Sequence, residues 1–301
     1  MPETIALTRV RKAYDEFLAV DDLTFGIAEG SVFGLLGPNG AGKTSTIRMM
    51  IGITAPDSGE ISVFGRPFER KSLQKIGYLP EERGLHRKMK VIEQLIFLGE
   101  LHGLAPADAR RRAMQWCERL DISEKLENKV EELSKGMQQK IQFIAALLHD
   151  PQFIIMDEPF FGLDPVNASL LKDVLVDLKK QGKTILFSTH RMDQVEKLCD
   201  AICLINRGKA VLQGALSQVK SRFGKNNVQI QYEGDDGFLH RKELVAVYNN
   251  YGNYVEVRLA QGADPQDLLH AAADHSRVSR FELMEPSLEE IFKEVVGRTD
   301  A

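Results

Sequence analysis

The chain has 301 residues, of which 43% are hydrophobic and 27% are charged. This composition is that of an ordinary globular protein, and it excludes a collagen-like chain, a disordered tail protein and a small disulfide-stapled domain. Lys and Arg number 39 against 43 Asp and Glu, which gives a formal net charge of −4. At ~150 residues per domain, this length suggests two domains, and we expect one of them to be larger.

The charge is distributed unevenly along the chain. Residues 1–224 hold 31 basic and 29 acidic side chains, whereas residues 225–301 hold 8 and 14. Neither part has the positive excess of a dedicated nucleic-acid binder, so we expect no nucleic-acid partner. The longest apolar run has six residues, Phe143 to Leu148. A membrane span needs ~20, so we expect none, and the N-terminus shows no secretory signal.

The three cysteines, Cys117, Cys199 and Cys203, are odd in number and widely spaced. This usage is typical of a reducing cytosol and argues against a disulfide framework. Cys199 and Cys203 lie four residues apart, but no histidine or further cysteine lies near them in the sequence. Buried apolar thiols are therefore a better interpretation than a zinc site.

Apolar strand patterns and helical patterns alternate over most of the chain up to residue 206. This alternation favours an α/β fold with a mainly parallel sheet and helices on its faces. Strands are expected at 5–11, 17–28, 31–36, within 61–79, and at 153–156, 184–188 and 201–206. Helices are expected at 44–53, 167–181 and 191–199.

Residues 91–149 interrupt this alternation with a block that shows only helical spacing. We expect it to form a separate helical lobe, at about 84–150, within a first domain of residues 1–222. The basic run Arg110–Arg112 is interpreted as a solvated helix face. Trp116 is interpreted as part of the core of this lobe rather than as a platform for a ligand.

The pattern changes after Gly224, where short strands separated by Asn/Gly turns begin. Ser287 followed by Glu290 resembles a capping box at the start of a last helix. The sequence therefore predicts a small α+β domain at 225–301. Its expected strands are 228–232, 244–248, 254–259 and 277–283, and its expected helices are 265–274 and 287–296.

The segment from Gly37 to Thr44 matches the phosphate-loop pattern G-x-x-x-x-G-K-[ST], with a strand before it and a helix after it. Glycine lets the backbone wrap closely enough for its N–H groups to point at phosphate oxygens. The helix N-terminus adds positive potential at the same place. We expect Lys43 to reach the β- and γ-phosphates and the Thr44 hydroxyl to ligate Mg²⁺.

A second chemical feature follows the apolar strand 153–156, where Asp157 and Glu158 stand side by side. A carboxylate at the end of a parallel strand lies at the carboxyl edge of the sheet, beside the glycine loop. We expect Asp157 to hold Mg²⁺ through water. We expect Glu158 to polarise the water that attacks the nucleotide.

With these motifs in this order, the chain resembles the ATP-binding subunits of ABC transporters over about residues 5–220. The resemblance implies a P-loop NTPase core of the ABC ATPase type with a helical lobe. The segment from Leu133 to Met137 resembles the signature motif, 20 residues before Asp157, and the segment from Phe161 to Asp164 resembles the D-loop. The family implies a nucleotide site of Tyr14, Asn39, Gly40, Ala41, Gly42, Lys43, Thr44 and Ser45, and a signature motif of Ser134, Lys135, Gly136, Met137 and Gln138.

Three further roles come from this resemblance. His190 matches the switch histidine, Tyr14 stands where the family stacks an aromatic ring on adenine, and Asp164 matches the D-loop aspartate. Residues 77–81 occupy the Q-loop.

The chain departs from the family pattern at some of these positions. Glu81 replaces the usual glutamine; it either approaches Mg²⁺ or turns away as a hinge residue, and we favour the metal side. Lys135 replaces the usual first glycine of the signature motif, and it either adds a cation near the γ-phosphate or points to solvent. Met137 replaces the usual glutamine of the motif, and we expect Gln138 to take over part of the role of that glutamine.

Residues 225–301 resemble the small accessory domain of a bacterial subgroup that includes sodium-extrusion and drug-export ATPases. The segments 77–85 and 285–292 carry this closer resemblance. The resemblance implies a Mg²⁺-dependent ATPase that works as a homodimer of single cassettes. It binds ATP between the two copies of the chain and powers export through a separate membrane permease. Its expected location is the cytoplasmic face of the cell membrane, as a peripheral protein.

Two other classes compete with this interpretation. A soluble ATPase of the same superfamily that acts on DNA carries long coiled coils between its phosphate loop and signature motif, and residues 44–133 are too few for one. The ribosome-acting kind usually carries two cassettes in one chain, and this chain has one. A nucleotide-binding regulatory module without turnover is disfavoured by the presence of Asp157, Glu158 and His190.

Overall fold

The computed structural model describes residues 2–82, 84–223 and 227–299. It divides into two compact units, Met1–Ala215 and Leu216–Ala301. The sequence predicted a first domain ending at residue 222. In the structure, the segment 216–222 groups with the second unit instead. The predicted start of the second domain at residue 225, its end at residue 301, and Arg83 of the segment 77–85 lie outside the described residues.

The first unit begins with an antiparallel sheet in the order β2-β1-β4-β5. Alternating apolar residues of its long strands, such as Ile5, Leu7 and Val10, are fully buried in a core that also contains Ile47 and Met50 of the first helix. The strands are β1 (Glu3–Tyr14), β2 (Phe17–Ala28), β4 (Ser58–Val63) and β5 (Arg66–Pro67).

The second sheet has the order β10-β9-β3-β8-β7-β6 and is parallel except for its edge strand β10. Strands β3, β7 and β8 are buried along their whole length, as expected for parallel strands covered on both faces. Their carboxyl ends therefore lie together at one edge. The strands are β3 (Val32–Leu36), β6 (Ile76–Leu79), β7 (Phe153–Asp157), β8 (Thr184–Thr189), β9 (Ala201–Asn206) and β10 (Lys209–Ala215).

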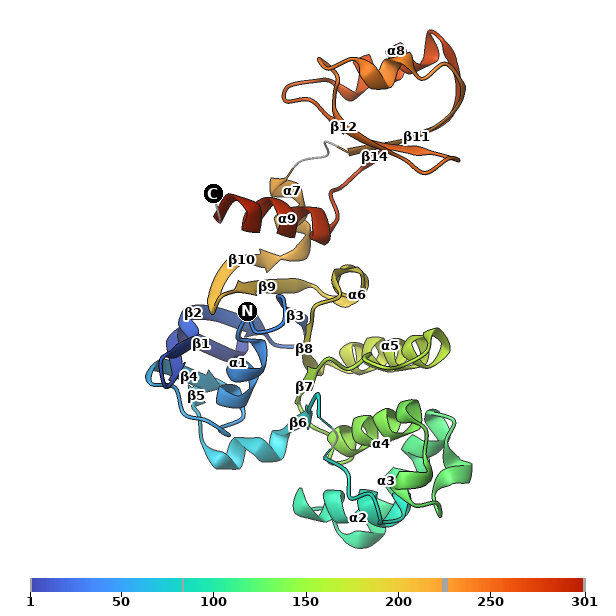
Figure 1. The fold of residues 1–301 in the computed structure, drawn as a ribbon. Coiled ribbons are helices and arrows are strands. Elements are labelled where there is room, and N and C mark those ends of the chain that lie inside the picture. Colours follow the sequence, from blue (N-terminus) through green and yellow to red (C-terminus); the bar gives the residue numbers. More distant parts are fainter. Residues whose placement is uncertain (1, 83, 224–226, 300–301) are drawn as a thin grey trace. The chain divides into compact units, whose positions relative to one another are not determined.

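The helices of this unit form two groups. Helices α1 (Lys43–Met50), α5 (Pro165–Lys180) and α6 (Met192–Leu198) follow strands of the parallel sheet. Figure 1 shows the other three gathered into a lobe beside it, which agrees with the helical block in the sequence. The lobe contains α2 (Val91–Leu101), α3 (Pro106–Arg119) and α4 (Lys135–Leu147), with short 3-10 turns η2 (Ser123–Lys125) and η3 (Val130–Glu132).

The second unit is an α+β domain with its own core. Its antiparallel sheet has the order β12-β13-β11-β14, and α8 covers one face of that sheet (Figure 1). Leu268 of α8 packs with Val228, Ile230 and Val257 of the strands. The elements are α7 (Leu216–Arg222), β11 (Asn227–Gly234), η4 (Gly237–His240), β12 (Val245–Asn250), β13 (Val255–Leu259), α8 (Pro265–Ala273), β14 (Ser276–Met284) and α9 (Leu288–Thr299).

Two parts of the structure differ from the expected elements. Strand β10 and helix α7 occupy residues 209–222, where the sequence suggested no element. β10 is an antiparallel edge strand whose residues are half-buried or exposed, so its pattern is weak. A 3-10 helix η1 (Arg70–Lys75) lies within the segment where only short strands were expected.

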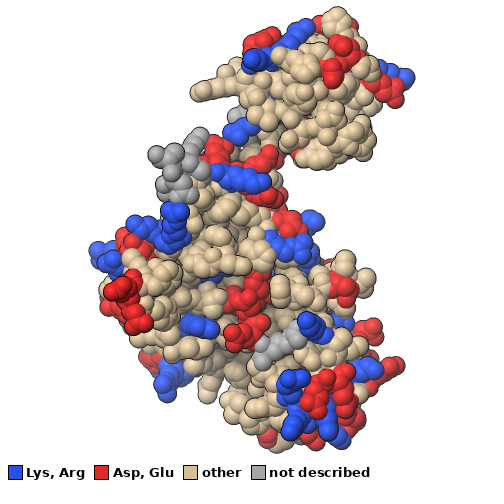
Figure 2. Space-filling model, in the orientation of Figure 1, with Lys and Arg blue, Asp and Glu red and all other residues tan. Residues whose placement is uncertain are grey.

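Two global properties bear on function. Among the described residues, no helix combines the length and the apolar character that crossing a bilayer requires. Figure 2 shows Lys and Arg interspersed with Asp and Glu over the face that it presents. The charged side chains on that face do not form a field of one sign.

Candidate nucleotide site

The glycine loop between β3 and α1 has a backbone that only glycine adopts easily. Gly42 has φ +109°, and a Cβ there would lie 2.4 Å from the Ala19 carbonyl oxygen. Gly37 has φ +153°, and its Cβ would lie 2.2 Å from the Ile205 carbonyl oxygen. Close packing against β2 and β9 therefore fixes the loop, and helix α1 starts directly after it at Lys43.

Lys43 is buried against this loop, with 7% of its surface exposed. Its Nζ donates to the carbonyl oxygens of Gly37 at 2.8 Å and Pro38 at 3.1 Å. Burial lowers the pKa of Lys43, while the nearby carboxylates of Glu158, Asp157 and Glu81 oppose that shift. A phosphate placed beside the ammonium group would act in the same direction as these carboxylates.

Asp157 ends β7 and links it to both neighbouring elements of the site. Its Oδ2 accepts a hydrogen bond from Thr44 Oγ1 at 2.9 Å, and its Oδ1 accepts one from Ser188 Oγ of β8. The side chain is 1% exposed. The hydroxyl of the phosphate-loop threonine and the strand-end carboxylate therefore lie in contact, as the sequence predicted for their positions.

Glu158 follows directly and has a left-handed backbone, with φ +50°. Its N–H donates to the Ser188 carbonyl oxygen at 3.1 Å, which holds this uncommon conformation. Its Oε1 accepts from the His190 N–H at 3.0 Å and pairs with His190 Nδ1 at 2.8 Å, while Oε2 accepts from Thr189 Oγ1 at 3.1 Å. Glu158 and His190, 32 residues apart, thus form one hydrogen-bonded cluster.

A pocket of about 350 Å³ opens over these groups. It brings together the predicted phosphate-loop residues, both carboxylates of the β7 end and Glu81, and it also includes Phe17 and Ala19 of β2. Its lining is Phe17, Ala19, Asn39, Gly40, Ala41, Gly42, Lys43, Thr44, Ser45, Glu81, Asp157 and Glu158.

Tyr14 lies outside this lining, at the end of β1 opposite Phe17 in the turn between the strands. It is 39% exposed, and Lys12 Nζ lies 5.5 Å from its ring centre. Phe17 is the aromatic residue of the pocket and is 62% exposed. The sequence pointed to Tyr14 and missed Phe17, although the three-residue spacing across one turn brings both rings to the same end of the hairpin.

Glu81 follows β6 and lines the same pocket as the phosphate loop. Burial raises the pKa of Glu81, and the charges of Asp157 and Glu158 raise it further. Three carboxylates therefore face one pocket with one buried ammonium group, Lys43. A cation bound among these oxygens would relieve their mutual repulsion.

The signature segment and Asp164 lie outside this pocket. Ser134 is the N-cap of α4, where its Oγ accepts from the Met137 N–H at 3.3 Å, and both Ser134 and Lys135 are exposed. Asp164 caps α5 by accepting from the N–H groups of Val166 and Asn167 at 3.0 Å each. The Gln138 amide donates to the carbonyls of Val130 and Leu133 at 3.0 Å each.

The model of the ABC transporter family matches residues 20–161, which include the phosphate loop, the signature segment and both site carboxylates. A second family model, the C-terminal domain of DrrA1-3-like ATP-binding proteins, matches residues 214–296. An uncharacterised ABC transporter ATP-binding protein, YhaQ of Bacillus subtilis, is 46% identical over 97% of this chain and 98% of its own length. The chain belongs to the ABC transporter ATP-binding proteins.

Two functionally named relatives also match over nearly the whole chain. Linearmycin resistance ATP-binding protein LnrL of Bacillus subtilis is 34% identical over 96% of this chain and 97% of its own. Nod factor export ATP-binding protein I of Paraburkholderia xenovorans is 36% identical over 99% of both. The solved ATP-binding subunit of an ABC transporter superposes with a TM-score of 0.68, at 30% identity over 73% of this chain and 93% of that one.

These comparisons fix the class of the ABC ATPase. It binds and hydrolyses ATP, and like other ATP-binding subunits of the family it works with membrane permease components. The predicted ABC ATPase fold and the predicted family are confirmed. The sequence did not single out Ser188 and Thr189, the hydroxyl groups that hold the two site carboxylates; their position at the end of a buried strand beside β7 was the available signal.

Proposed function

We propose that the ABC ATPase hydrolyses MgATP at the pocket over the phosphate loop, with Glu158 as the base. The supporting observation is the position of Glu158, whose carboxylate lines this pocket and is held by Thr189 and His190. A carboxylate fixed on both oxygens can accept a proton from a water placed in the pocket. His190 orients Glu158 through the 2.8 Å contact.

Lys43 is proposed to bind the transferring phosphoryl group by exchanging its contacts with Gly37 and Pro38 for phosphate oxygens. The backbone N–H groups of Asn39, Gly40, Ala41 and Gly42, with Ser45 at the helix start, complete the cradle. Such a fixed cation and aligned dipoles stabilise the charge that develops during transfer. Tyr14, or Phe17 from the pocket lining, is proposed to contact the adenine ring of the nucleotide.

The chemistry of the donor set fits Mg²⁺. Thr44 and Asp157 present oxygens within 2.9 Å of each other, and Glu81 lines the same pocket. Mg²⁺ is commonly held by one or two carboxylates together with substrate phosphates and water. We infer that Thr44, Asp157 and Glu81 lie around the ion, which supplies charge neutralisation on the phosphates when it is bound.

The active ATPase is proposed to be a homodimer. The chain carries one phosphate loop and one signature segment, and Ser134, Lys135 and Gly136 do not line its own pocket. Ser134 and Lys135 are exposed at the N-terminus of α4, where the helix dipole favours an anion. A second copy that faces the pocket would complete the site with Ser134, Lys135, Gly136, Met137 and Gln138, and Asp164 would contact across the same interface.

The transported material is proposed to leave the cell, because the names of two relatives refer to export and resistance. The ABC ATPase would then act at the cytoplasmic face of the membrane, bound to its permease, and without a nucleic-acid partner. The unit Met1–Ala215, with the lobe at about 84–150, is proposed to be the motor domain. The unit Leu216–Ala301 is proposed to be an accessory domain.

Purification of the tagged chain from native membranes tests this function. We expect a protein with several membrane spans to accompany it in fixed proportion, and the complex to hydrolyse ATP. The Lys43→Ala chain should bring down the same partner without ATPase activity. Recovery of ribosomes or DNA-bound proteins in place of a membrane partner would contradict transport.

A further inference from the structure

A second pocket of the first unit lies between the helical lobe and the parallel sheet. It has a volume of about 290 Å³ and is lined by one face of α3, the end of α4, the segment that leads into β7, the end of α5 and the turn before β8. We call it the α3 pocket. Its lining is Arg111, Arg112, Gln115, Trp116, Arg119, Leu147, Leu148, Asp150, Pro151, Ile154, Leu178, Gln181 and Lys183.

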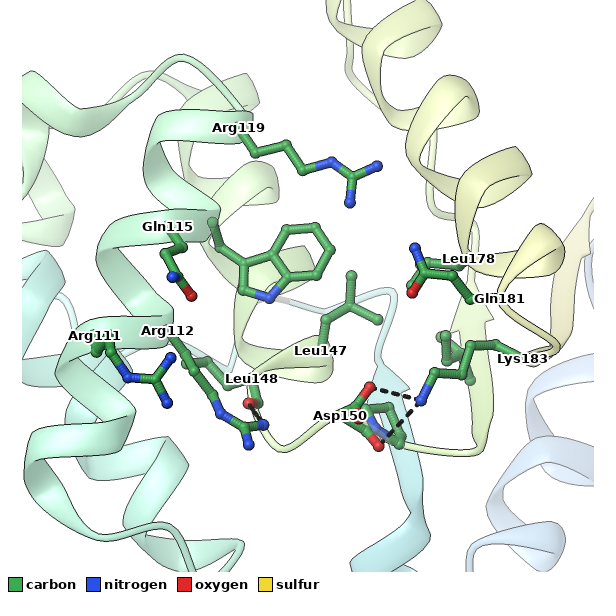
Figure 3. Close-up of a pocket in the computed structure, with 13 residues that line it drawn as sticks. Arg111, Arg112, Gln115, Arg119, Leu147, Leu148, Asp150, Leu178, Gln181 and Lys183 are labelled. Atoms are coloured by element: carbon green, nitrogen blue, oxygen red, sulfur yellow. Dashed lines mark hydrogen bonds and ion pairs between the residues drawn. The ribbon is translucent and has the colours of Figure 1, made fainter.

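The α3 pocket carries an excess of positive charge. Four of its lining residues are cationic, namely Arg111, Arg112, Arg119 and Lys183, and Asp150 is the one acidic residue of the lining. Lys183 Nζ pairs with Asp150 Oδ1 at 2.6 Å, so these two charges cancel. In Figure 3, Arg112 and Arg119 extend from one helix towards Gln181 and Lys183 on the opposite wall.

Among the described residues, Arg112 is the one cation of the lining without an ion pair. One of its nitrogens donates to the Leu148 carbonyl oxygen at 3.0 Å, and the described residues offer no carboxylate within ion-pair distance. A guanidinium has five N–H donors in a planar fork that fits phosphate oxygens. Most of this donor capacity, with its full charge, is therefore available at the pocket.

The other two arginines of the pocket also have N–H donors that their ion pairs do not use. Arg119 pairs with Asp177 at 2.8 Å, and its Cζ lies 5.2 Å from the ring centre of Trp116. Arg111 pairs with Asp108 at 3.0 Å on the exposed side of the helix. The indole of Trp116 and the side chains of Leu147 and Leu178 add an apolar wall, while Gln115 and Gln181 add amide donors.

We propose that the α3 pocket is a second anion site of this chain, for a small molecule that bears one or two phosphate groups. The volume of about 290 Å³ is just below the usual range of ligand pockets, ~300–1,000 Å³, which favours a compact ligand over a polymer. Arg112 binds the phosphate, Arg111 and Arg119 add positive charge at the rim of the pocket, and Trp116 contacts the rest of the molecule. The ligand touches both the lobe, through α3, and the sheet, through Lys183.

The spacing of α3 explains why the sequence suggested only a solvated face. Arg112, Trp116 and Arg119 are separated by four and three residues and so share one helix face, whereas Arg110 points elsewhere and does not line the pocket. Only the approach of the Lys183 segment, 71 residues further along the chain, turns that face into a cavity.

Trp116 makes the test local, because it is the single tryptophan of the chain. We would titrate the full-length Lys43→Ala chain with inorganic pyrophosphate and record tryptophan fluorescence, with heat of binding measured in parallel. The Lys43→Ala background weakens pyrophosphate binding at the phosphate loop. We expect a saturable change with one site per chain, and none with sodium chloride of equal ionic strength.

Two variants and one control assign the site. In the same background, Arg112→Gln should weaken pyrophosphate binding by about tenfold or more, because a charge-assisted contact is lost. The matched variant Arg110→Gln, on the same helix but outside the pocket, should bind as the parent does. Arg111→Gln removes a cation without touching the Leu148 contact, and it decides the question if Arg112→Gln does not fold.

The proposal is overturned by any of three results. The first is the absence of both a saturable Trp116 fluorescence change and a heat of binding. The second is that Arg110→Gln and Arg112→Gln weaken pyrophosphate binding equally. The third is that every arginine variant of the pocket that folds binds pyrophosphate with full affinity.

Discussion

At the scale of single residues, Glu158 has the clearest expected effect. Glu158→Gln keeps the shape and the possible contacts to Thr189 and His190, but it removes the proton acceptor. We expect ATP hydrolysis to fall by about 10²–10⁴-fold, since a general base contributes about this much. ATP binding should survive, because Lys43 and Thr44 remain.

Parallel assays of phosphate release and nucleotide binding check this prediction. Lys43→Ala is the matched comparison, because it should lose both binding and turnover. A Glu158→Gln chain that hydrolyses ATP at the parent rate would remove Glu158 from the role of base.

Glu81 is the departure from the family pattern that the structure brings into the pocket. If an oxygen at this position approaches Mg²⁺, Glu81→Gln keeps that oxygen and should retain most of the activity. Glu81→Ala should lose about tenfold or more, the usual effect of removing a group that supports a metal site, and should also lose coupling to the permease. ATPase assays on the reconstituted complex at saturating Mg²⁺ measure both, and parent activity in Glu81→Ala would refute the metal-side interpretation.

Gly42 tests the backbone of the loop. Gly42→Ala meets two costs, a left-handed φ of +109° and a Cβ only 2.4 Å from the Ala19 carbonyl. We expect loss of ATP binding and a lower melting temperature. Gly65→Ala is the control, because it shares a positive φ of +71° but has no heavy atom within 4 Å of the added carbon. It should cost only ~1–2 kcal/mol of stability and leave ATP binding intact; equal losses in both variants would contradict the steric argument.

At the scale of elements, His149 joins the end of α4 to β6. Its Nε2 contacts the Ile76 carbonyl oxygen at 3.0 Å, its ring stacks on His102 with centres 3.8 Å apart, and its buried Nδ1 has no partner among the described residues. Burial, helped by the neighbouring His102, lowers the pKa of His149 to about 4. The folded chain therefore keeps this ring neutral where an unfolded chain, with a pKa near 6.5, protonates it.

This difference predicts a pH dependence of stability. Between pH ~6.5 and about 4 the unfolded state binds a proton that the folded state does not bind. The free energy of unfolding therefore falls as the pH drops. His149→Gln keeps an amide donor for Ile76 and does not titrate. Its melting temperature should depend less on pH across this window than that of the parent chain. An unchanged slope in His149→Gln would refute the assignment.

The sequence pattern predicted some secondary-structure elements and missed others. The helical block of residues 91–149 was recognisable from its spacing, because each helix buries one face. The edge strand β10 was not, because an edge strand with half-exposed residues has little alternation to detect. Helix α7 follows it directly and groups with the second unit, which moved the division to residue 215.

At the scale of the whole molecule, the proposed dimer makes a mixing prediction. Lys43→Ala disables the phosphate loop and Ser134→Arg disables the signature segment, so each variant alone should be inactive. In a symmetric pair of different variants, one composite site has both defects and the other has none. After mixing and exchange we expect about a quarter of the parent ATPase rate, because half of the pairs are mixed and each has one intact site.

The assay is ATP turnover before and after mixing, with circular dichroism to show that Ser134→Arg is folded despite the lost helix cap. Two copies of the same variant, mixed in the same way, are the control. No recovery, with exchange demonstrated by differently tagged chains, would contradict a site shared between two copies.

The sequence by itself determined the chemistry of the main site. Gly37–Thr44 and His190 follow buried strands of a parallel sheet, and Asp157 ends another. The carboxyl ends of such strands meet at one edge of the sheet. Local rules were therefore sufficient to bring these residues together. The same rules predicted the phosphate loop, because its glycines answer a requirement of the local backbone.

Only the tertiary structure decided which groups surround that chemistry. Phe17, Ser188 and Thr189 reach the site, and Lys183 faces Arg112 in the α3 pocket, through the approach of segments distant in sequence. No spacing along the chain encodes such approaches, since they follow from how strands order themselves in a sheet and how a helical lobe packs beside it. The sequence specifies the type of each side chain, whereas tertiary packing determines which other side chains it contacts.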